Sequence, residues 1–284
     1  MLRPLSGRAS FGSDAPRRQS TMSRHINSAK LAVLCSVAVL LAAANTSRAA
    51  KAEQSEIITV PSPAEFFAAI DKIAQPDWAS FYRDPAPTSY SSRPQTAVNL
   101  GALVADGYIA VEAQDGQQVK NTGKDIIALA RSLGVGEHVL SRGKSISDFA
   151  DKNDWAALKE ELEATTNEVR MAMADQRDEA LASLIAAGAW IRSLQVGSRS
   201  AELSGEEAAR ELLRQSSLVA YLNGELEHLP EKISSTAAAV DTRAMLAALV
   251  QTMKTEDQPL AGTQAAEING TTSRFIALIS AKPQ

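Results

Sequence analysis

A carboxylate inside an apolar stretch is the first candidate for chemistry. Asp106 lies within residues 94–113, the most apolar stretch after residue 49. A buried carboxylate requires a cationic partner or changes its pKa, and either outcome marks a site. The candidate partners are Arg93, Arg131 and Arg192. The alternative, and the commoner arrangement, is a solvent-facing polar strip that Asp106 shares with Asn99.

Aromatic side chains gather in a second candidate region, residues 75–94. Four prolines in this segment exclude a regular helix. Its site candidates are Trp78, Phe81, Tyr82, Arg83 and Tyr90. Aromatic rings beside an arginine are typical of the residues that dominate protein interfaces. The alternative is that these rings seal one end of a helical bundle.

Other catalytic chemistries lack their residues. After residue 49 the histidines are His138 and His228, too far apart for a paired-histidine zinc motif, and no cysteine remains. Residues 142–145 read RGKS, the end of a phosphate loop, but His138 occupies the place of its first glycine. No G-x-S-x-G serine elbow occurs. We therefore predict no metal and no cofactor, and we assign no catalytic residue.

The N-terminal region has the pattern of a secretory signal peptide. Residues 31–44 are apolar or small, basic residues precede them, and the small-residue cleavage site Ser47-Arg48-Ala49 follows. The apolar run is shorter than the ~20 residues that span a bilayer as a helix. We expect a leader over residues 1–49, with Met22 as an alternative start, and a mobile lead-in over residues 50–61. The expected location is periplasmic or extracellular, with no transmembrane segment after cleavage.

The charge of the remaining chain excludes one class of partner. Seven of the 29 basic residues and one of the 33 acidic residues lie in the first 49 positions, which leaves 22 against 32 and a net charge of −10. Nucleic-acid binding requires basic residues clustered on one face, and no basic run occurs after residue 50. We predict no nucleic-acid partner and no binding to an anionic membrane surface.

Helical periodicity indicates the elements that must position these residues. Residues 154–196 carry an apolar stripe with three- and four-residue spacing, so they require further helices to cover it. As one helix they would measure about 65 Å, and a break near residues 175–178 is the alternative. In residues 94–113, Ala97, Gly101 and Ala105 form a smooth side that a neighbouring helix can approach closely. Further helices are expected at residues 62–75, 117–133, 138–142, 147–152, 204–215, 218–229, 232–254 and 262–280.

These patterns predict an all-α fold: a single irregular multi-helix bundle over residues 62–281. The segment 75–94 forms a non-helical arm between its first two helices. The function favoured by the sequence is non-catalytic binding of another envelope or secreted protein, with the arm as the contact. A second function is a helical carrier of an apolar small molecule or lipid, with the smooth side of residues 94–113 lining the space. A third is a carboxylate-dependent enzyme that uses Asp106.

Overall fold

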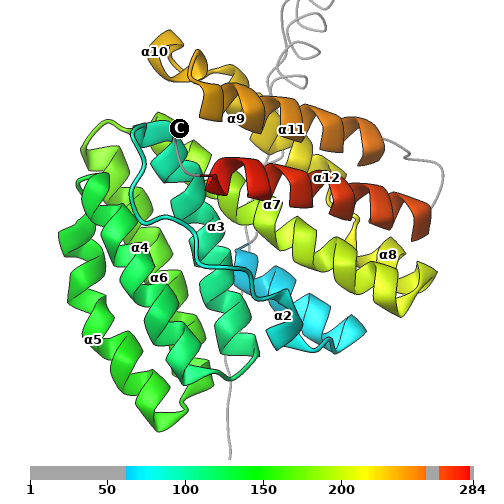
Figure 1. Cartoon of the computed structure of the whole chain (residues 1–284), viewed down its shortest axis with the longest axis horizontal. Helices are drawn as coiled ribbons and strands as arrows, with labels where there is room; N and C mark the ends of the chain where they lie inside the picture. Colours follow the sequence, from blue (N-terminus) through cyan, green and yellow to red (C-terminus); the bar gives the residue numbers. More distant parts are fainter. Residues whose placement is uncertain (1–61, 254–261, 282–284) are drawn as a thin grey trace, which may run out of the picture. The chain divides into compact units, whose positions relative to one another are not determined.

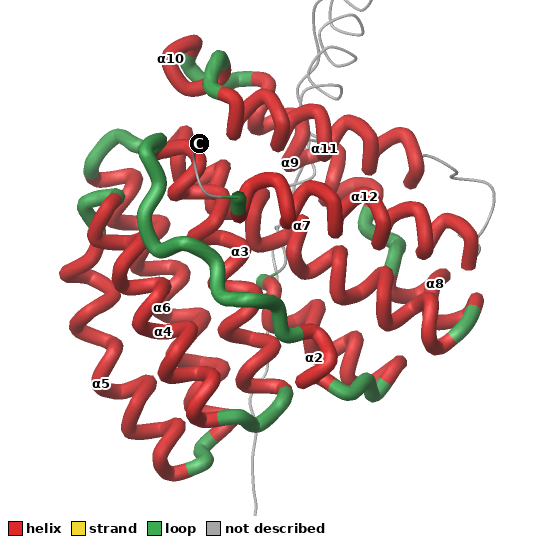
Figure 2. The backbone as a smooth tube through the Cα atoms, viewed as in Figure 1, coloured by secondary structure: helices red, strands yellow, loops and turns green. Residues whose placement is uncertain are grey.

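The chain folds into helices throughout the part that the structure describes. The structure is a computed structural model that describes residues 62–253 and 262–281. These residues contain eleven α-helices and one short 3-10 helix, and no β-strand (Figure 2). The all-α prediction is therefore confirmed for them. The predicted leader over residues 1–49 and the lead-in over residues 50–61 lie outside the described residues.

Most of the described helices follow one another through short connections, and the arm between η1 and α3 is longer. The first half of the domain contains α2 (Pro63–Ala74), the 3-10 helix η1 (Trp78–Phe81), α3 (Arg93–Glu112), α4 (Gly116–Ser132), α5 (Gly136–Lys152) and α6 (Trp155–Asp175). The second half contains α7 (Glu179–Ser204), α8 (Glu206–Leu212), α9 (Ser216–Glu227), α10 (Glu231–Ser234), α11 (Ala237–Met253) and α12 (Gly262–Ser280).

Two central helices, α3 and α7, cross at unusually close range. A methyl group added at Gly101 of α3 would lie 1.9 Å from the carbonyl oxygen of Ile185 on α7. One added at Gly188 of α7 would lie 2.1 Å from the carbonyl oxygen of Val98 on α3. Only glycine allows two helix backbones to come this near. The smooth side of α3 that the sequence predicts is therefore occupied by α7.

The other helices surround this central pair. In Figure 1, α4, α5 and α6 form a group on one side, and α12 lies along α7 on the other with α9 and α11 beyond it. Apolar residues from nearly every helix join one continuous core. The helix α7 is long and apolar enough to cross a membrane, but 72% of its most apolar window is buried among the other helices. Such burial is expected of the core helix of a bundle.

Several local outcomes differ from or settle the sequence expectations. The helix expected over residues 232–254 is divided into α10 and α11, and the arm expected to be non-helical contains the 3-10 helix η1. Residues 154–196 form two helices, α6 and α7, because the polar residues 176–178 make a turn in which Arg177 adopts a left-handed φ of 59°. The two short helices expected within residues 136–153 are one continuous helix, α5. Its buried Val139, Ile146 and Ala150 keep a helical spacing, and no proline lies between them to end the helix.

Candidate functional site

The arm begins with two aromatic side chains that belong to the core. Trp78 and Phe81 are only 6% and 9% exposed. The indole Nε1 of Trp78 donates a hydrogen bond to Asp71 Oδ1 at 3.0 Å. The Trp78 ring also packs edge-on against Phe67 and Phe81. These two rings therefore have little surface left for contact with another protein.

The remaining arm candidates are half-buried against the bundle. The Tyr82 hydroxyl donates to Asp115 Oδ2 at 3.4 Å, and burial, together with the charge of Asp115, raises the pKa of Tyr82 to about 12. Burial likewise raises the pKa of Tyr90 to about 12. Arg83 reaches under the arm to α3 and α12, where its Nη1 donates to Ser280 Oγ at 2.8 Å. The arm is thus held down at several points along its length.

Asp106 lies at the centre of a buried ion-pair group, which we call the Asp106 cluster: Asp106, Arg83 and Arg192. Arg83 Nε donates to Asp106 Oδ2 at 2.7 Å, and Arg192 Nε donates to Asp106 Oδ1 at 2.8 Å. The other Arg192 donors bind the Phe81 carbonyl oxygen at 2.6 Å and Gln195 Oε1 at 2.7 Å. The Arg192 side chain is 4% exposed and that of Asp106 is 13% exposed.

The surroundings of Asp106 keep it ionised. Burial alone would raise the pKa of its carboxyl, but the guanidinium groups of Arg192 and Arg83 outweigh that effect and lower the pKa. A carboxylate in this state has no proton to donate near neutral pH. Among the three partners expected from the sequence, Arg192 makes the contact, whereas Arg93 pairs with Asp178 at 2.7 Å. Asn99 is buried and donates to the Ile279 carbonyl oxygen at 2.8 Å.

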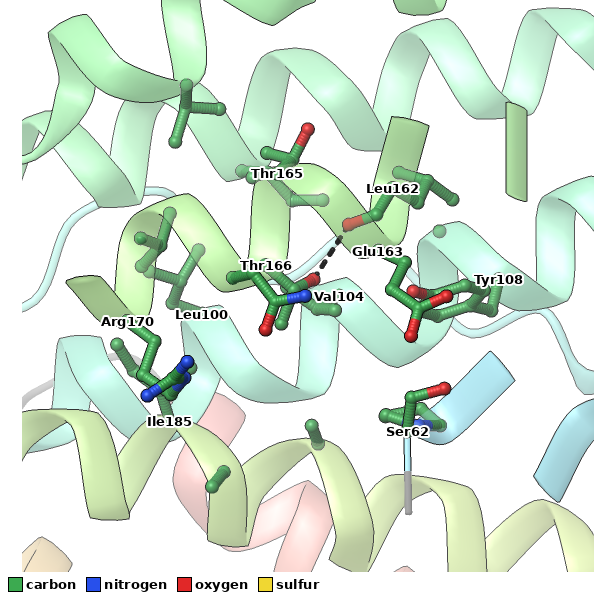
Figure 3. A pocket seen from close by; sticks show the side chains of 18 of the residues that line it. Ser62, Leu100, Val104, Tyr108, Leu162, Glu163, Thr165, Thr166, Arg170 and Ile185 are labelled. Atoms are coloured by element: carbon green, nitrogen blue, oxygen red, sulfur yellow. Dashed lines mark hydrogen bonds between the residues drawn. The ribbon is translucent and has the colours of Figure 1, made fainter. Parts of the chain in front are cut away.

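A cavity of about 900 Å³ opens between the helices on another side of α3. Its walls come mainly from α3, α4, α5, α6 and α7, and the first residues of α2 and part of α9 complete it. Apolar side chains form most of its lining, including Leu100, Val104, Leu162, Ile185 and Trp190. Figure 3 shows the side of α6 that faces this cavity. The volume lies within the range of about 300–1,000 Å³ that is typical of ligand pockets.

Three polar side chains meet at one end of the cavity, and we call them the Tyr108 corner: Tyr108, Glu163 and Thr166. The Tyr108 ring is 1% exposed and stacks on Phe67 at a centroid distance of 5.9 Å. Its hydroxyl lies on the side of the corner that holds the Thr166 and Glu163 side chains (Figure 3). Burial first, and then the charge of Glu163, raise the pKa of Tyr108 above its ordinary range. The phenol is therefore protonated at any physiological pH.

The charged residues of the cavity lie near its rim. Lys120 pairs with Asp151 on α5. Arg170 forms no hydrogen bond or ion pair with any residue that the structure describes, and it is exposed. In Figure 3 it lies near Ile185, away from Tyr108 and Glu163. No group of three or more His, Cys, Asp or Glu side chains among residues 62–253 and 262–281 could hold a metal ion.

The sequence contains almost no signal that predicts this cavity. Thr166 and Leu162 are visible only as members of an apolar stripe, and Tyr108 only as one apolar residue of a central helix. The smooth side of α3 expected to line a ligand space does not do so, because Ala97 and Ala105 are fully buried and Gly101 contacts α7. The neighbouring side, with Leu100, Val104 and Tyr108, lines the cavity instead.

Comparison with known proteins assigns no function to the cavity or to the Asp106 cluster. The chain matches no protein-family model, no curated protein and no solved structure.

Proposed function

We propose that this protein binds an apolar small molecule or a lipid in the cavity beside α3 and serves as its carrier. The observation that supports this proposal is the cavity of about 900 Å³, whose lining is mostly apolar. Transfer of apolar ligand surface from water into such a space is favourable by about 25 cal/mol per Å². Bundles commonly hold ligands between facing helices in this way.

Two features of the arrangement support reversible binding. The rim carries charged side chains of both signs, among them Lys124, Arg170, Glu163 and Glu179, so water reaches the entrance. The floor is built from α3 and α7, whose close crossing fixes its shape before a ligand arrives. A preformed floor reduces the entropy lost on binding.

Contact with another envelope or secreted protein through the arm remains a prediction. Its candidates are Trp78, Phe81, Tyr82, Arg83 and Tyr90. The burial of Trp78 and Phe81 leaves Tyr82, Arg83 and Tyr90 as the residues able to reach a partner. Export by a cleaved leader, and hence a periplasmic or extracellular location, is likewise a proposal, which rests on the sequence of residues 1–49.

The test fills the cavity and measures binding of a neutral naphthylamine fluorophore, whose emission rises in apolar surroundings. Ala186 of α7 lines the cavity, so Ala186→Phe should reduce the affinity at least tenfold. Ala248 of α11 is exposed and does not line the cavity, so Ala248→Phe is the matched control and should bind as the unaltered protein does. Circular dichroism confirms that both variants fold.

A second variant that blocks the cavity is needed, because Ala186→Phe could disturb α7 without filling the cavity. Val104→Phe fills the same space from α3. Native mass spectrometry of the protein purified from its own cells should also show a bound apolar ligand. Unchanged fluorophore binding in both blocking variants would exclude the cavity as the binding site.

A further inference from the structure

Two buried aromatic side chains carry hydrogen-bond donors on the wall of the cavity. They are Tyr108 of α3 and Trp190 of α7, which are 1% and 2% exposed and both line it. Within the described part of the chain, neither the Tyr108 hydroxyl nor the Trp190 indole N–H makes a short, well-aligned hydrogen bond. Thr165 is also a buried polar residue of the lining, but its hydroxyl donates to the Glu161 carbonyl oxygen at 2.6 Å.

A donor without a partner is available to a ligand only if it reaches open space. The hydroxyl groups of Tyr90 and Ser200 also lack a partner, but these two oxygens are sealed inside the protein. The Tyr108 hydroxyl and the Trp190 Nε1 are not sealed in this way. Because both residues line the cavity, the cavity is the space that their donors reach.

Thr166 is the neighbouring protein group that competes for the Tyr108 proton. Its own hydroxyl donates to the Leu162 carbonyl oxygen at 2.9 Å, as the dashed line in Figure 3 shows. Its influence on the pKa of Tyr108 is smaller than that of burial and of the Glu163 charge. Thr166 is therefore a weak acceptor for Tyr108, and the Tyr108 proton stays available.

One helix, α2, holds both donors in place. The Tyr108 ring stacks on Phe67 of α2 at a centroid distance of 5.9 Å, and the Trp190 ring packs against Phe66 of α2 at 5.5 Å. The first residues of α2 line the cavity as well. A few preset polar groups in a mostly apolar pocket fix the orientation of a ligand. The two donors therefore mark the α2 end as the place for the ligand's polar group.

We propose that the ligand is an apolar molecule with a hydrogen-bond acceptor at one end, and that this end binds Tyr108 and Trp190. This proposal rests on the proposed carrier function. An indole N–H only donates, and the Tyr108 hydroxyl has a proton to give, so an oxygen with lone pairs suits both. A carbonyl, hydroxyl or carboxylate oxygen has this chemistry. A hydrocarbon would displace water from both donors without replacing its hydrogen bonds, which weakens binding.

The experiment compares tridecane with methyl undecyl ketone, which has the same number of carbon atoms and one acceptor oxygen. Each ligand displaces the naphthylamine fluorophore, whose own affinity is measured first in every variant. The readout is the ratio of the ketone affinity to the alkane affinity, because the solubilities of the two ligands cancel when variants are compared. Tyr108→Phe should lower this ratio about tenfold, since the ketone loses a donor and the alkane no longer leaves one unpaired.

The matched control makes the same substitution at another tyrosine of the cavity. Tyr221 of α9 is only half-buried, so water can take its proton, and Tyr221→Phe should keep the ratio within about twofold of the unaltered protein. Trp190→Phe removes the second donor but keeps a ring against Phe66, and it should lower the ratio about threefold or more. Circular dichroism confirms that each variant folds.

The outcomes separate the acceptor proposal from the carrier function. An unchanged ratio in Tyr108→Phe and Trp190→Phe, with both ligands still displacing the fluorophore, would overturn the acceptor proposal and leave the carrier function standing. Equal decreases in Tyr108→Phe and Tyr221→Phe would overturn it as well. Failure of both ligands to displace the fluorophore from the unaltered protein would count against the carrier function itself.

Discussion

Asp106 and Tyr108 stand two residues apart on α3, on different sides of it, and the protein treats their polar groups in opposite ways. Asp106 accepts hydrogen bonds from two arginines, and the remaining donors of Arg192 also find protein acceptors. Tyr108 faces a cavity and lies beside a carboxylate that has no cationic partner among the described residues. The Asp106 carboxylate and the Arg192 donors are paired within the protein, whereas the Tyr108 corner faces a cavity.

This difference separates residues that hold the fold from residues that are available to a ligand. A buried carboxylate that is paired with two arginines fixes the arm, α3 and α7 in one arrangement, and its loss leaves a buried charge unpaired. The Tyr108 hydroxyl and the exposed Glu163 carboxylate contribute little to folding, whereas the Tyr108 ring packs against Phe67 as part of the core. Stability measurements should therefore respond to Asp106, and binding measurements should respond to Tyr108 and Glu163.

The largest effect on stability should come from Asp106→Ala. The free energy of unfolding should fall by about 3–5 kcal/mol, because Arg192 would stay buried without its carboxylate. Urea denaturation measures this change. Glu163→Ala is the control from the other region: Glu163 is exposed, so this variant should stay within about 0.5 kcal/mol of the unaltered protein. Similar losses in the two variants would remove the distinction between the two regions.

Acidification should remove the contribution of Asp106 to the free energy of unfolding without any substitution. The pKa of Asp106 is lower in the folded state than in the unfolded state, where it is about 3.9. Its contribution is therefore fully present above the unfolded pKa and is lost as the pH falls through that value toward the folded one. Between about pH 5 and pH 2, Asp106→Asn should lose less stability than the unaltered protein. Parallel pH profiles would mean that Asp106 is not held ionised.

Replacing either of two glycines of α3 by alanine compares the side of α3 that packs on α7 with the side that faces the cavity. Gly101→Ala should lower the free energy of unfolding by about 1–3 kcal/mol or more, because its methyl group would overlap the backbone of α7. Gly107→Ala should raise it by about 0.5–1 kcal/mol, because the nearest side-chain atom, on Ile126, would lie 3.8 Å away. Urea denaturation of both variants tests the pair. If both substitutions changed the free energy of unfolding in the same direction, the close contact of Gly101 with α7 and the free space beside Gly107 would be contradicted.

The fold could be predicted from the sequence because local signals and burial agree. Asp115 caps α4 by accepting from the backbone N–H of Gln118 at 2.9 Å, as its position before an apolar stripe suggests. The spacing of Ala97, Gly101 and Ala105 predicts a closely packed side, and α7 occupies it. The sequence leaves open whether residues 154–196 break, because a turn made by a single left-handed residue, Arg177, has no strong composition signal.

The cavity could not be predicted, because it depends on where packing is incomplete. Apolar spacing indicates that Leu100 and Val104 face other residues, but it gives no measure of the distance to the opposite wall. The Arg83 contact with Asp106 was equally invisible, since it joins the irregular arm to a helix. Arg192 could be named as a candidate because an arginine on an apolar helix requires a carboxylate.

The contacts of α12 have a consequence for the order in which the helices fold. Asn99 on α3 binds the carbonyl of Ile279, 180 positions later, and Arg83 binds Ser280, 197 positions later. The group α4, α5 and α6, by contrast, is built from contacts between consecutive helices. Contacts that are local in sequence form first, and long-range ones carry a larger entropic cost of loop closure. The green group of Figure 1 should therefore assemble first, and the arm should close over α3 only after α12 has docked.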